Sequence, residues 1–141
     1  MIEIIIQYQS QILKALGETG VLLLLSIAAA LVFGLPLGTI LYLTKPDGIH
    51  ENHWLHRSIN FFVNIVRSFP FLLFIIFMIP ITRFIVGTSL GTLGASIPMA
   101  VVAISLYTRF VEQALLDVPN EVVDTALSLG ANTWRIVSRF L

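Results

Sequence analysis

Residues 19–44 read TGVLLLLSIAAALVFGLPLGTILYLT and contain no charged side chain. A helix needs about 20 apolar residues to cross the hydrocarbon core of a bilayer, so this run is long enough to span one. Residues 84–108 also lack charge, and residues 59–82 carry only Arg67. We therefore expect an all-α integral membrane protein. The expected spans cover about residues 20–43, 59–82 and 92–113.

Composition supports a membrane protein and excludes several function classes. The chain is 57% hydrophobic and 11% charged, whereas soluble domains carry about 25% charged residues. Its formal net charge is zero, which gives no basic surface for nucleic acid. It has no cysteine for a disulfide framework or a thiolate metal site. His50, His53 and His56 share one polar loop without a completing ligand set, so a solvated loop is favoured over a metal site. We expect no metal and no cofactor.

The N-terminal region and the first span carry two local patterns. Polar and apolar side chains in residues 1–19 alternate with the period of a helix, which predicts an amphipathic lead-in to the first span or, less favoured, a separate helix in the membrane interface. Within the first span, Gly34 and Gly38 flank Pro36. Proline kinks a helix, and small residues four apart let helices approach closely. We expect a kink with close packing here rather than a dedicated dimer motif.

A polar stripe runs along the second expected span. Asn60, Asn64, Arg67 and Ser68 follow the spacing of one helix face, so they are expected to face protein or water instead of lipid. A charge inside a membrane is costly, which makes Asn64, Arg67 and Ser68 candidates for a solute pathway or a gate. The alternative, which we favour, is that Arg67 snorkels to the nearby cytoplasmic end or forms a structural ion pair.

Two further polar patterns have structural interpretations. Arg109 and Glu112 lie three residues apart, which predicts an ion pair on one helix face. Residues 87–91 read GTSLG and match the G-x-S-x-G pattern of a nucleophile elbow. That pattern needs a strand, a turn and a helix with an acid and a histidine nearby. Here it connects two apolar spans, and the histidines are expected across the membrane, so we do not expect an intramembrane hydrolase.

The C-terminal segment is polar enough to leave the membrane. Asn120 is suited to cap a short helix, with Glu121 close to its positive N-terminus. Gly130 is suited to the left-handed position that ends a helix. A helix over about 120–130 would expose Glu121 and Asp124 beside apolar side chains. Such a surface is suited to docking a partner, and an ordinary interfacial connector is the alternative.

The distribution of Lys and Arg predicts the orientation in the membrane. With three spans, the loop over 44–58 and the segment over 115–141 lie on one side. That side carries Lys45, Arg57, Arg135 and Arg139. Because cytoplasmic loops are enriched in Lys and Arg, we expect the N-terminus outside and the C-terminal segment in the cytoplasm. The chain has no phosphate-binding loop, so ATP-driven work would need a nucleotide-binding partner.

These residues resemble the permease subunits of bacterial ABC importers. Asp124, Thr125 and Ala126 occupy the E-A-A part of the family's cytoplasmic motif, and Gly130 occupies its glycine. Asp124 keeps the charge of the usual Glu, while Thr125 and Phe140, at an Ile position, depart from the motif. Further segments are similar to the methionine-type permease. They are residues 35–42, 63–71, 78–80, 83–89 and 109–116.

The resemblance implies a type I importer permease fold over residues 20–141. Three spans and the coupling helix are present and the last two spans are missing, so the chain is expected to be a C-terminally truncated permease. The coupling helix, about 120–130, docks into a cleft on the ATPase. Its coupling residues are Asp124, Ala126 and Gly130, with Glu121 as a neighbouring candidate.

The implied function is import of an amino acid, with methionine as the best candidate, by alternating access. The implied partners are a second copy of the chain, two ATP-binding subunits that hydrolyse the ATP, and an extracytoplasmic solute-binding lipoprotein. The implied location is the bacterial inner membrane. Two alternatives are a small membrane scaffold or adaptor and a non-functional truncated permease.

Overall fold

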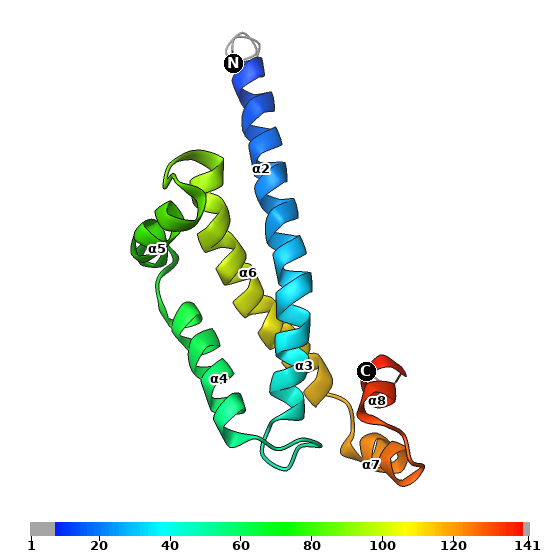
Figure 1. The fold of residues 1–141 in the computed structure, drawn as a ribbon. Helices are drawn as coiled ribbons and strands as arrows, with labels where there is room; N and C mark the ends of the chain where they lie inside the picture. Colours follow the sequence, from blue (N-terminus) through cyan, green and yellow to red (C-terminus); the bar gives the residue numbers. More distant parts are fainter. Residues whose placement is uncertain (1–7, 140–141) are drawn as a thin grey trace.

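The computed structural model describes residues 8–139, and every regular element in that range is helical (Figure 1). The elements are α2 (Gln9–Ala29), the π-helical turn η1 (Ala30–Gly34), α3 (Leu35–Leu43), α4 (His53–Ser68), α5 (Phe71–Val86), α6 (Gly91–Leu116), α7 (Asn120–Ser128) and α8 (Thr133–Arg139). Residues 1–7 of the expected lead-in helix, and Phe140 of the motif, lie outside the described residues. From Gln9 onward the lead-in belongs to α2 and so extends the first span.

The first span is one long rod made of α2, η1 and α3. It runs from Gln9 to Leu43 and is apolar enough to cross a membrane. The wide turn η1 ends two residues before Pro36. Proline has no amide hydrogen, and its ring crowds the preceding turn. A π-helical turn is a common way to absorb such a disturbance within a continuing helix. The expected kink therefore takes the form of a widened turn.

Gly34 and Gly38 lie so close to α6 that a side chain at either position would collide with it. A Cβ atom on Gly34 would come within 3.1 Å of the Ile104 carbonyl oxygen, and one on Gly38 within 2.6 Å of the Val111 Cβ. The buried Thr108 hydroxyl, which donates to Ile104, also lies 3.4 Å from the Gly34 carbonyl oxygen. The expected close packing is confirmed, and it occurs within one chain.

Replacing Gly38 with leucine is expected to lower the midpoint of thermal unfolding, followed by circular dichroism in detergent. The nearest atoms are a backbone carbonyl and a Cβ, which cannot rotate away, and overpacking of this kind costs about 1–3 kcal/mol. Gly20→Leu is the matched control, because nothing lies within 4 Å of a Cβ there. Equal melting of the two variants would contradict the tight contact between α3 and α6.

The expected span over residues 59–82 is not one straight helix. Two helices, α4 and α5, meet there at 115°. Phe69 and Pro70 form an elbow with extended backbone, at ψ 134 and 131. Proline disfavours the helical conformation in the residue before it, so the helix ends at Ser68. α4 and α5 have 16 residues each, or about 24 Å at 1.5 Å per residue, which is short of the roughly 30 Å hydrocarbon core.

By length and composition, two helical segments are able to cross a membrane alone, the rod from Gln9 to Leu43 and α6. The bent pair of α4 and α5 makes a third if it counts as one span. α6 lies between the rod and the bent pair and contacts both (Figure 1). Its ends, Gly91 and Leu116, agree with the expected span over 92–113.

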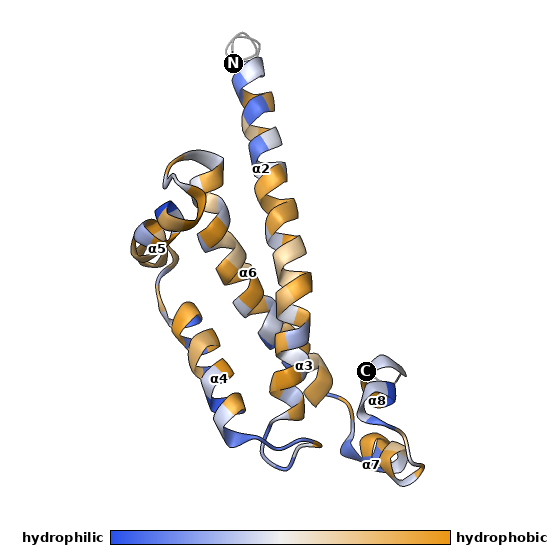
Figure 2. Cartoon of the chain, in the orientation of Figure 1, coloured by the Kyte–Doolittle hydropathy of each residue, from blue (hydrophilic) through white to orange (hydrophobic). Residues whose placement is uncertain are grey.

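Much of the apolar surface faces outward. Hydrophobic residues cover the middle of the rod, while polar residues gather at the start of α2 and in the loop between α3 and α4 (Figure 2). Leu24 of the rod is 68% exposed and Leu72 of α5 is 74% exposed. Soluble monomers rarely expose contiguous apolar patches larger than a few hundred Å². This surface is suited to lipid or to partner helices.

Candidate functional site

The short helix α7 projects from the end of α6, and its start differs in detail from the expectation. Asn120 is the first helical residue instead of the cap, and no side chain caps the helix. Pro119 occupies the cap position with an extended backbone, and its carbonyl accepts from the Val122 amide at 3.0 Å. Glu121 lies in the first turn, where a carboxylate is favourable beside the unpaired amides.

The end of α7 is a left-handed turn at Gly130, as expected. Gly130 has φ 75, a value that a glycine adopts without steric cost. The Ala131 amide donates to the Ala126 carbonyl at 3.0 Å, and the Gly130 amide donates to the Leu127 carbonyl at 2.9 Å. This pair of bonds is a Schellman motif, which satisfies carbonyls that a helix end leaves open. The turn fixes where the chain leaves α7 for α8.

The expected coupling residues lie on different faces of α7. Val123 and Ala126 are buried within the chain, at 7% and 4% exposure, so Ala126 has little surface of its own to offer a partner. Asp124 lines a cleft on one side of the helix. Glu121 lines a second, more open hollow on the neighbouring face of the helix, together with Thr125 and Leu129. The two acidic side chains thus line different hollows, although they stand three residues apart and so on neighbouring faces of the helix.

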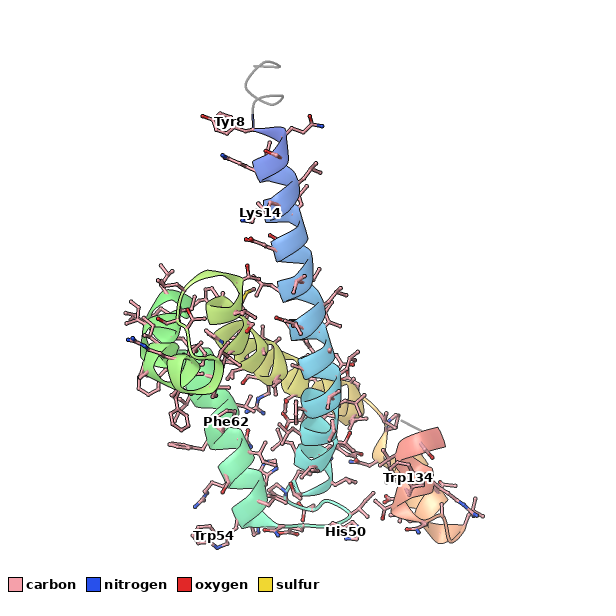
Figure 3. All side chains as sticks on the ribbon, turned by 45° about the horizontal axis from the view of Figure 1, so that its top comes forward. Tyr8, Lys14, His50, Trp54, Phe62 and Trp134 are labelled. Atoms are coloured by element: carbon pink, nitrogen blue, oxygen red, sulfur yellow. The ribbon has the colours of Figure 1, made fainter. Side chains whose placement is uncertain are left out.

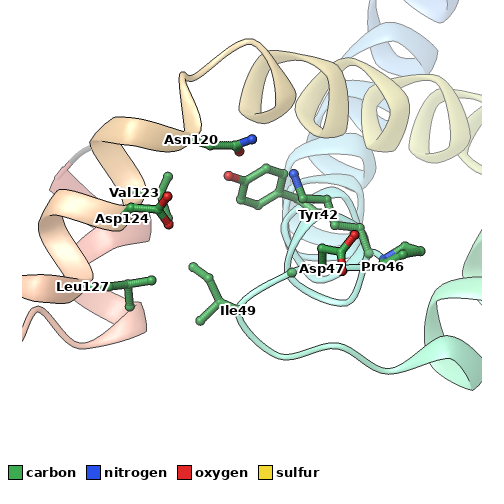
Figure 4. Close-up of a pocket in the computed structure, with 10 residues that line it drawn as sticks. Tyr42, Pro46, Asp47, Ile49, Asn120, Val123, Asp124 and Leu127 are labelled. Carbon is green, nitrogen blue, oxygen red and sulfur yellow. The ribbon is translucent and has the colours of Figure 1, made fainter.

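The cleft beside Asp124 lies between α7 and the loop that follows α3, with a volume of about 470 Å³. Asp124 and Leu127 face the Tyr42 ring and Ile49 across it (Figure 4). Lys45 lies on the same wall, with its ammonium 4.5 Å from the centre of the Tyr42 ring, a cation–π contact. Each wall of the cleft therefore carries both polar and apolar side chains.

The loop over residues 44–52 is a compact turn tied to α8. Asp47 has φ 61, and the Gly48 amide donates to the Lys45 carbonyl at 2.9 Å. His50 Nε2 lies 3.1 Å from the Thr133 hydroxyl at the start of α8. Figure 3 shows this loop at the same end of the molecule as Trp134 of α8. The loop and the α7–α8 unit thus form one end of the protein.

The three histidines of this region do not converge. His50 contacts Thr133, and His53 lies 2.7 Å from the Glu51 carboxylate. His56 belongs to the first turn of α4 and is part of a different network. Within residues 8–139, no group of three metal-binding side chains comes together.

Arg109 of α6 is the centre of that network. Its guanidinium donates to Glu112 on the same helix, which confirms the expected pair. It also donates to the side-chain oxygens of Asn60 and, at 2.8 Å, of Asn64, both on α4. The Arg109 and Glu112 side chains are 18% and 11% exposed. The network therefore joins α4 to α6 two turns before α6 ends.

His56 extends the network to the end of α3. The Asn60 amide lies 2.8 Å from His56 Nε2, and His56 Nδ1 lies 3.0 Å from the Leu41 carbonyl oxygen. A carbonyl only accepts, so Nδ1 carries the hydrogen and Nε2 accepts from Asn60. The expectation of a solvated His56 is therefore wrong. The spacing of His56, Asn60 and Asn64, each four apart, was the signal that places it on this face.

The structure divides the polar stripe expected on the second span. Asn60 and Asn64 bind Arg109, whereas Ser68 donates back to the Asn64 carbonyl of its own helix at 2.7 Å. Arg67 lies in the last turn of α4, at the elbow, where it lines a small cavity. Within residues 8–139, Arg67 forms no ion pair. Arg67 therefore lies outside the network that joins Asn60 and Asn64 to Arg109.

Residues 30–141 match the family described as "Binding-protein-dependent transport system inner membrane component". The chain belongs to this family. Membership and the apolar helices make the protein a multi-pass component of the inner membrane. The family consists of inner-membrane components of transport systems, and the relatives named below are permease proteins. Its fold is that of a type I ABC importer permease.

The named relatives of this chain are transport permeases, which agrees with the family that its residues match. The chain is 40% identical over 130 residues to the "D-methionine transport system permease protein MetI" of Salmonella typhimurium, and 38% identical over 130 residues to that of Escherichia coli (strain K12). Each alignment covers 92% of this chain and 60% of the relative. The chain thus spans about three fifths of the length of these relatives.

Two solved structures share the fold of this chain. Both are described as inward facing conformations of the MetNI methionine ABC transporter. The CY5 SeMet soak crystal form gives a TM-score of 0.87 at 37% identity, covering 94% of this chain and 62% of the matched chain. The CY5 native crystal form gives 0.84 at 38% identity, covering 90% and 59%.

Proposed function

We propose that the chain is the membrane-spanning part of an ATP-driven amino-acid importer, with methionine as the solute. The observation that carries this proposal is α7, a short helix closed by the Gly130 turn and held outside the apolar helices. Family membership, and the methionine named for the relatives, support the solute. A membrane adaptor that transports nothing would not explain why the matched family and the named relatives are parts of transport systems.

The proposed complex has two copies of this permease, two ATP-binding subunits and an extracytoplasmic solute-binding lipoprotein. α7 docks on an ATP-binding subunit through Glu121, Asp124 and the apolar side chains beside them. Closure of the ATP-binding subunits then moves α7 and favours one of two membrane conformations over the other. A ligand or nucleotide shifts such an equilibrium only by its differential affinity for the two states.

The proposed orientation places the N-terminus outside and α7 in the cytoplasm. Two observations support it. The loop with Lys45 and the unit with Arg135 lie at one end of the molecule, and the start of α2 lies at the other (Figure 1). The Lys and Arg bias assigns the first of these ends to the cytoplasm.

Asp124→Asn is expected to weaken binding of the ATP-binding subunit to the detergent-purified permease by about tenfold, because an interfacial carboxylate loses its charge. Asp124→Glu keeps the charge and is expected to retain most of the affinity. The measurement is an equilibrium titration of the purified subunit, read by fluorescence anisotropy.

The matched control is Asp117→Asn, which removes an exposed carboxylate in the turn before α7. It is expected to leave the affinity unchanged. If Asp124→Asn and Asp117→Asn behave alike, Asp124 has no special place in docking. If the unaltered protein binds no ATP-binding subunit at all, the importer proposal itself fails.

A further inference from the structure

A partly open cavity of about 160 Å³ lies at the elbow between α4 and α5, and the proposed docking site does not use it. Three of its walls are the aromatic rings of Phe69, Phe71 and Phe74, and Arg67 lines it beside them. Its floor comes from α6 through Val102 and Leu106. The lining is thus apolar and aromatic with a single cation.

The cavity lies level with the middle of α6. Val102 and Leu106 are close to the midpoint of α6, which runs from Gly91 to Leu116 and is long enough to cross on its own. Arg67 is about 21 Å along α4 from His53, at 1.5 Å per residue. That distance is beyond what a snorkelling side chain covers from the loop end. Snorkelling or a structural ion pair, the interpretation of Arg67 favoured from the sequence, stays a prediction, and a solute as the partner of Arg67 is the alternative to it.

An arginine at this depth needs an anion. A charge at the centre of a bilayer costs about 2.5–3.5 kcal/mol by insertion scales and is paired as a rule. Within residues 8–139 the two ion pairs are His53 with Glu51 and Arg109 with Glu112, so no carboxylate serves Arg67. A solute that carries a carboxylate supplies the missing charge.

The helix break adds polar backbone to the same place. The first hydrogen bond of α5 runs from the Phe74 amide to the Pro70 carbonyl, so the amides of residues 71–73 precede the helical ladder. Open backbone groups at membrane depth are tolerated only against protein or a water-filled cavity. Broken helices of membrane transporters use such ends to hold polar solutes. The break therefore suits a solute with charged groups beside an apolar side chain.

We propose that the elbow cavity is a solute-binding site for a zwitterionic amino acid with a flexible apolar side chain. The carboxylate of the solute binds Arg67, and the side chain lies among the three phenylalanine rings. A thioether is well suited, because sulfur makes favourable contacts with aromatic rings. The volume is below the roughly 300–1,000 Å³ of drug-sized pockets, so one small side chain fits and a peptide does not. This inference rests on the proposed import function and assigns a place to its solute.

The test is equilibrium binding of radiolabelled L-methionine to the purified protein in nanodiscs, up to millimolar concentration. Arg67→Gln is expected to weaken binding by about tenfold or more, the effect of losing a charge-assisted hydrogen bond. L-methionine methyl ester, which lacks the carboxylate charge, competes about equally weakly with the label on the unaltered protein and on Arg67→Gln. Arg67→Lys keeps the charge and restores most of the affinity for methionine.

Arg57→Gln is the control, because it removes an exposed arginine from the first turns of the same helix. It is expected to bind methionine normally. The proposal is overturned if Arg67→Gln binds methionine as well as the unaltered protein does, if it weakens methionine and the ester to the same extent, or if the unaltered protein binds no methionine. In each case, retained binding of the ATP-binding subunit would show that the import function stands without this site.

Discussion

Arg109→Met is expected to destabilise the protein by about 3 kcal/mol, because removing one partner of a buried ion pair leaves the other charge uncompensated. The affected carboxylate is that of Glu112, which is 11% exposed. Asn60 and Asn64 lose their donor at the same time, so α4 loses its polar attachment to α6. We place the cost at the low end of the usual range since the Arg109 side chain keeps 18% of its exposure. The measurement is unfolding by denaturing detergent, followed by circular dichroism.

The double variant Arg109→Met with Glu112→Leu separates pairing from packing. It removes both charges, and replacing a buried pair by apolar groups is often nearly neutral. It is expected to recover part of the lost stability. A double variant less stable than Arg109→Met would mean that the unpaired carboxylate is not the cause. Arg57→Met, at an exposed position on α4, is expected to change nothing.

Gly130→Asp is expected to reduce ATP-coupled methionine uptake by about tenfold in membrane vesicles that contain the complete transporter. The backbone at Gly130 has φ 75, a left-handed conformation that Asp and Asn adopt more readily than other side chains but less readily than Gly, so Gly130→Asp and Gly130→Asn share this part of the effect. The new carboxylate also stands one residue beyond the surface that we propose for docking. Both effects disturb the turn that directs α7.

Gly130→Asn is the matched control for this prediction. Asparagine has nearly the same size, tolerates the left-handed conformation and carries no charge. It is expected to retain more uptake than Gly130→Asp and to assemble with the ATP-binding subunits. Unchanged assembly and uptake in Gly130→Asp would count against a coupling role for this turn.

The parts of the fold that the sequence predicts correctly depend on local chemistry. The rod and α6 follow from runs without charge, whose length alone determines whether a helix crosses the membrane. The end of α7 follows from one glycine, because few other residues adopt a positive φ. The pair of Arg109 and Glu112 follows from their spacing on one helix.

The elbow is not predictable in the same way. Pro80 and Pro98 lie inside helices α5 and α6, whereas Pro70 separates two helices. Membrane helices tolerate proline when neighbouring groups satisfy the backbone. The residue type therefore does not decide between a kink and a break, and packing against α6 does. The contacts of Arg109 with Asn60 and Asn64 have the same character, since they join residues 49 and 45 positions apart.

The site predictions also separate into features set by local sequence and features set by packing. Glu121 and Asp124 could be placed on a short exposed helix from the sequence, but the sequence does not show that they line two different hollows. Ala126 matches the motif, yet its side chain is covered by its own chain. Burial of this kind depends on how α7 is held by the rest of the protein, which no local pattern contains.

The contact of Gly38 with α6 has a mechanical consequence. Where a glycine admits no atom between two backbones, one helix cannot slide along the other without a clash at Val111. The rod and α6 are then expected to move as one rigid unit, with α7 attached at its end. A displacement of α7 by a partner would tilt both crossing helices together. The Phe69–Pro70 elbow, where α4 and α5 meet at 115°, is where we expect this protein to bend.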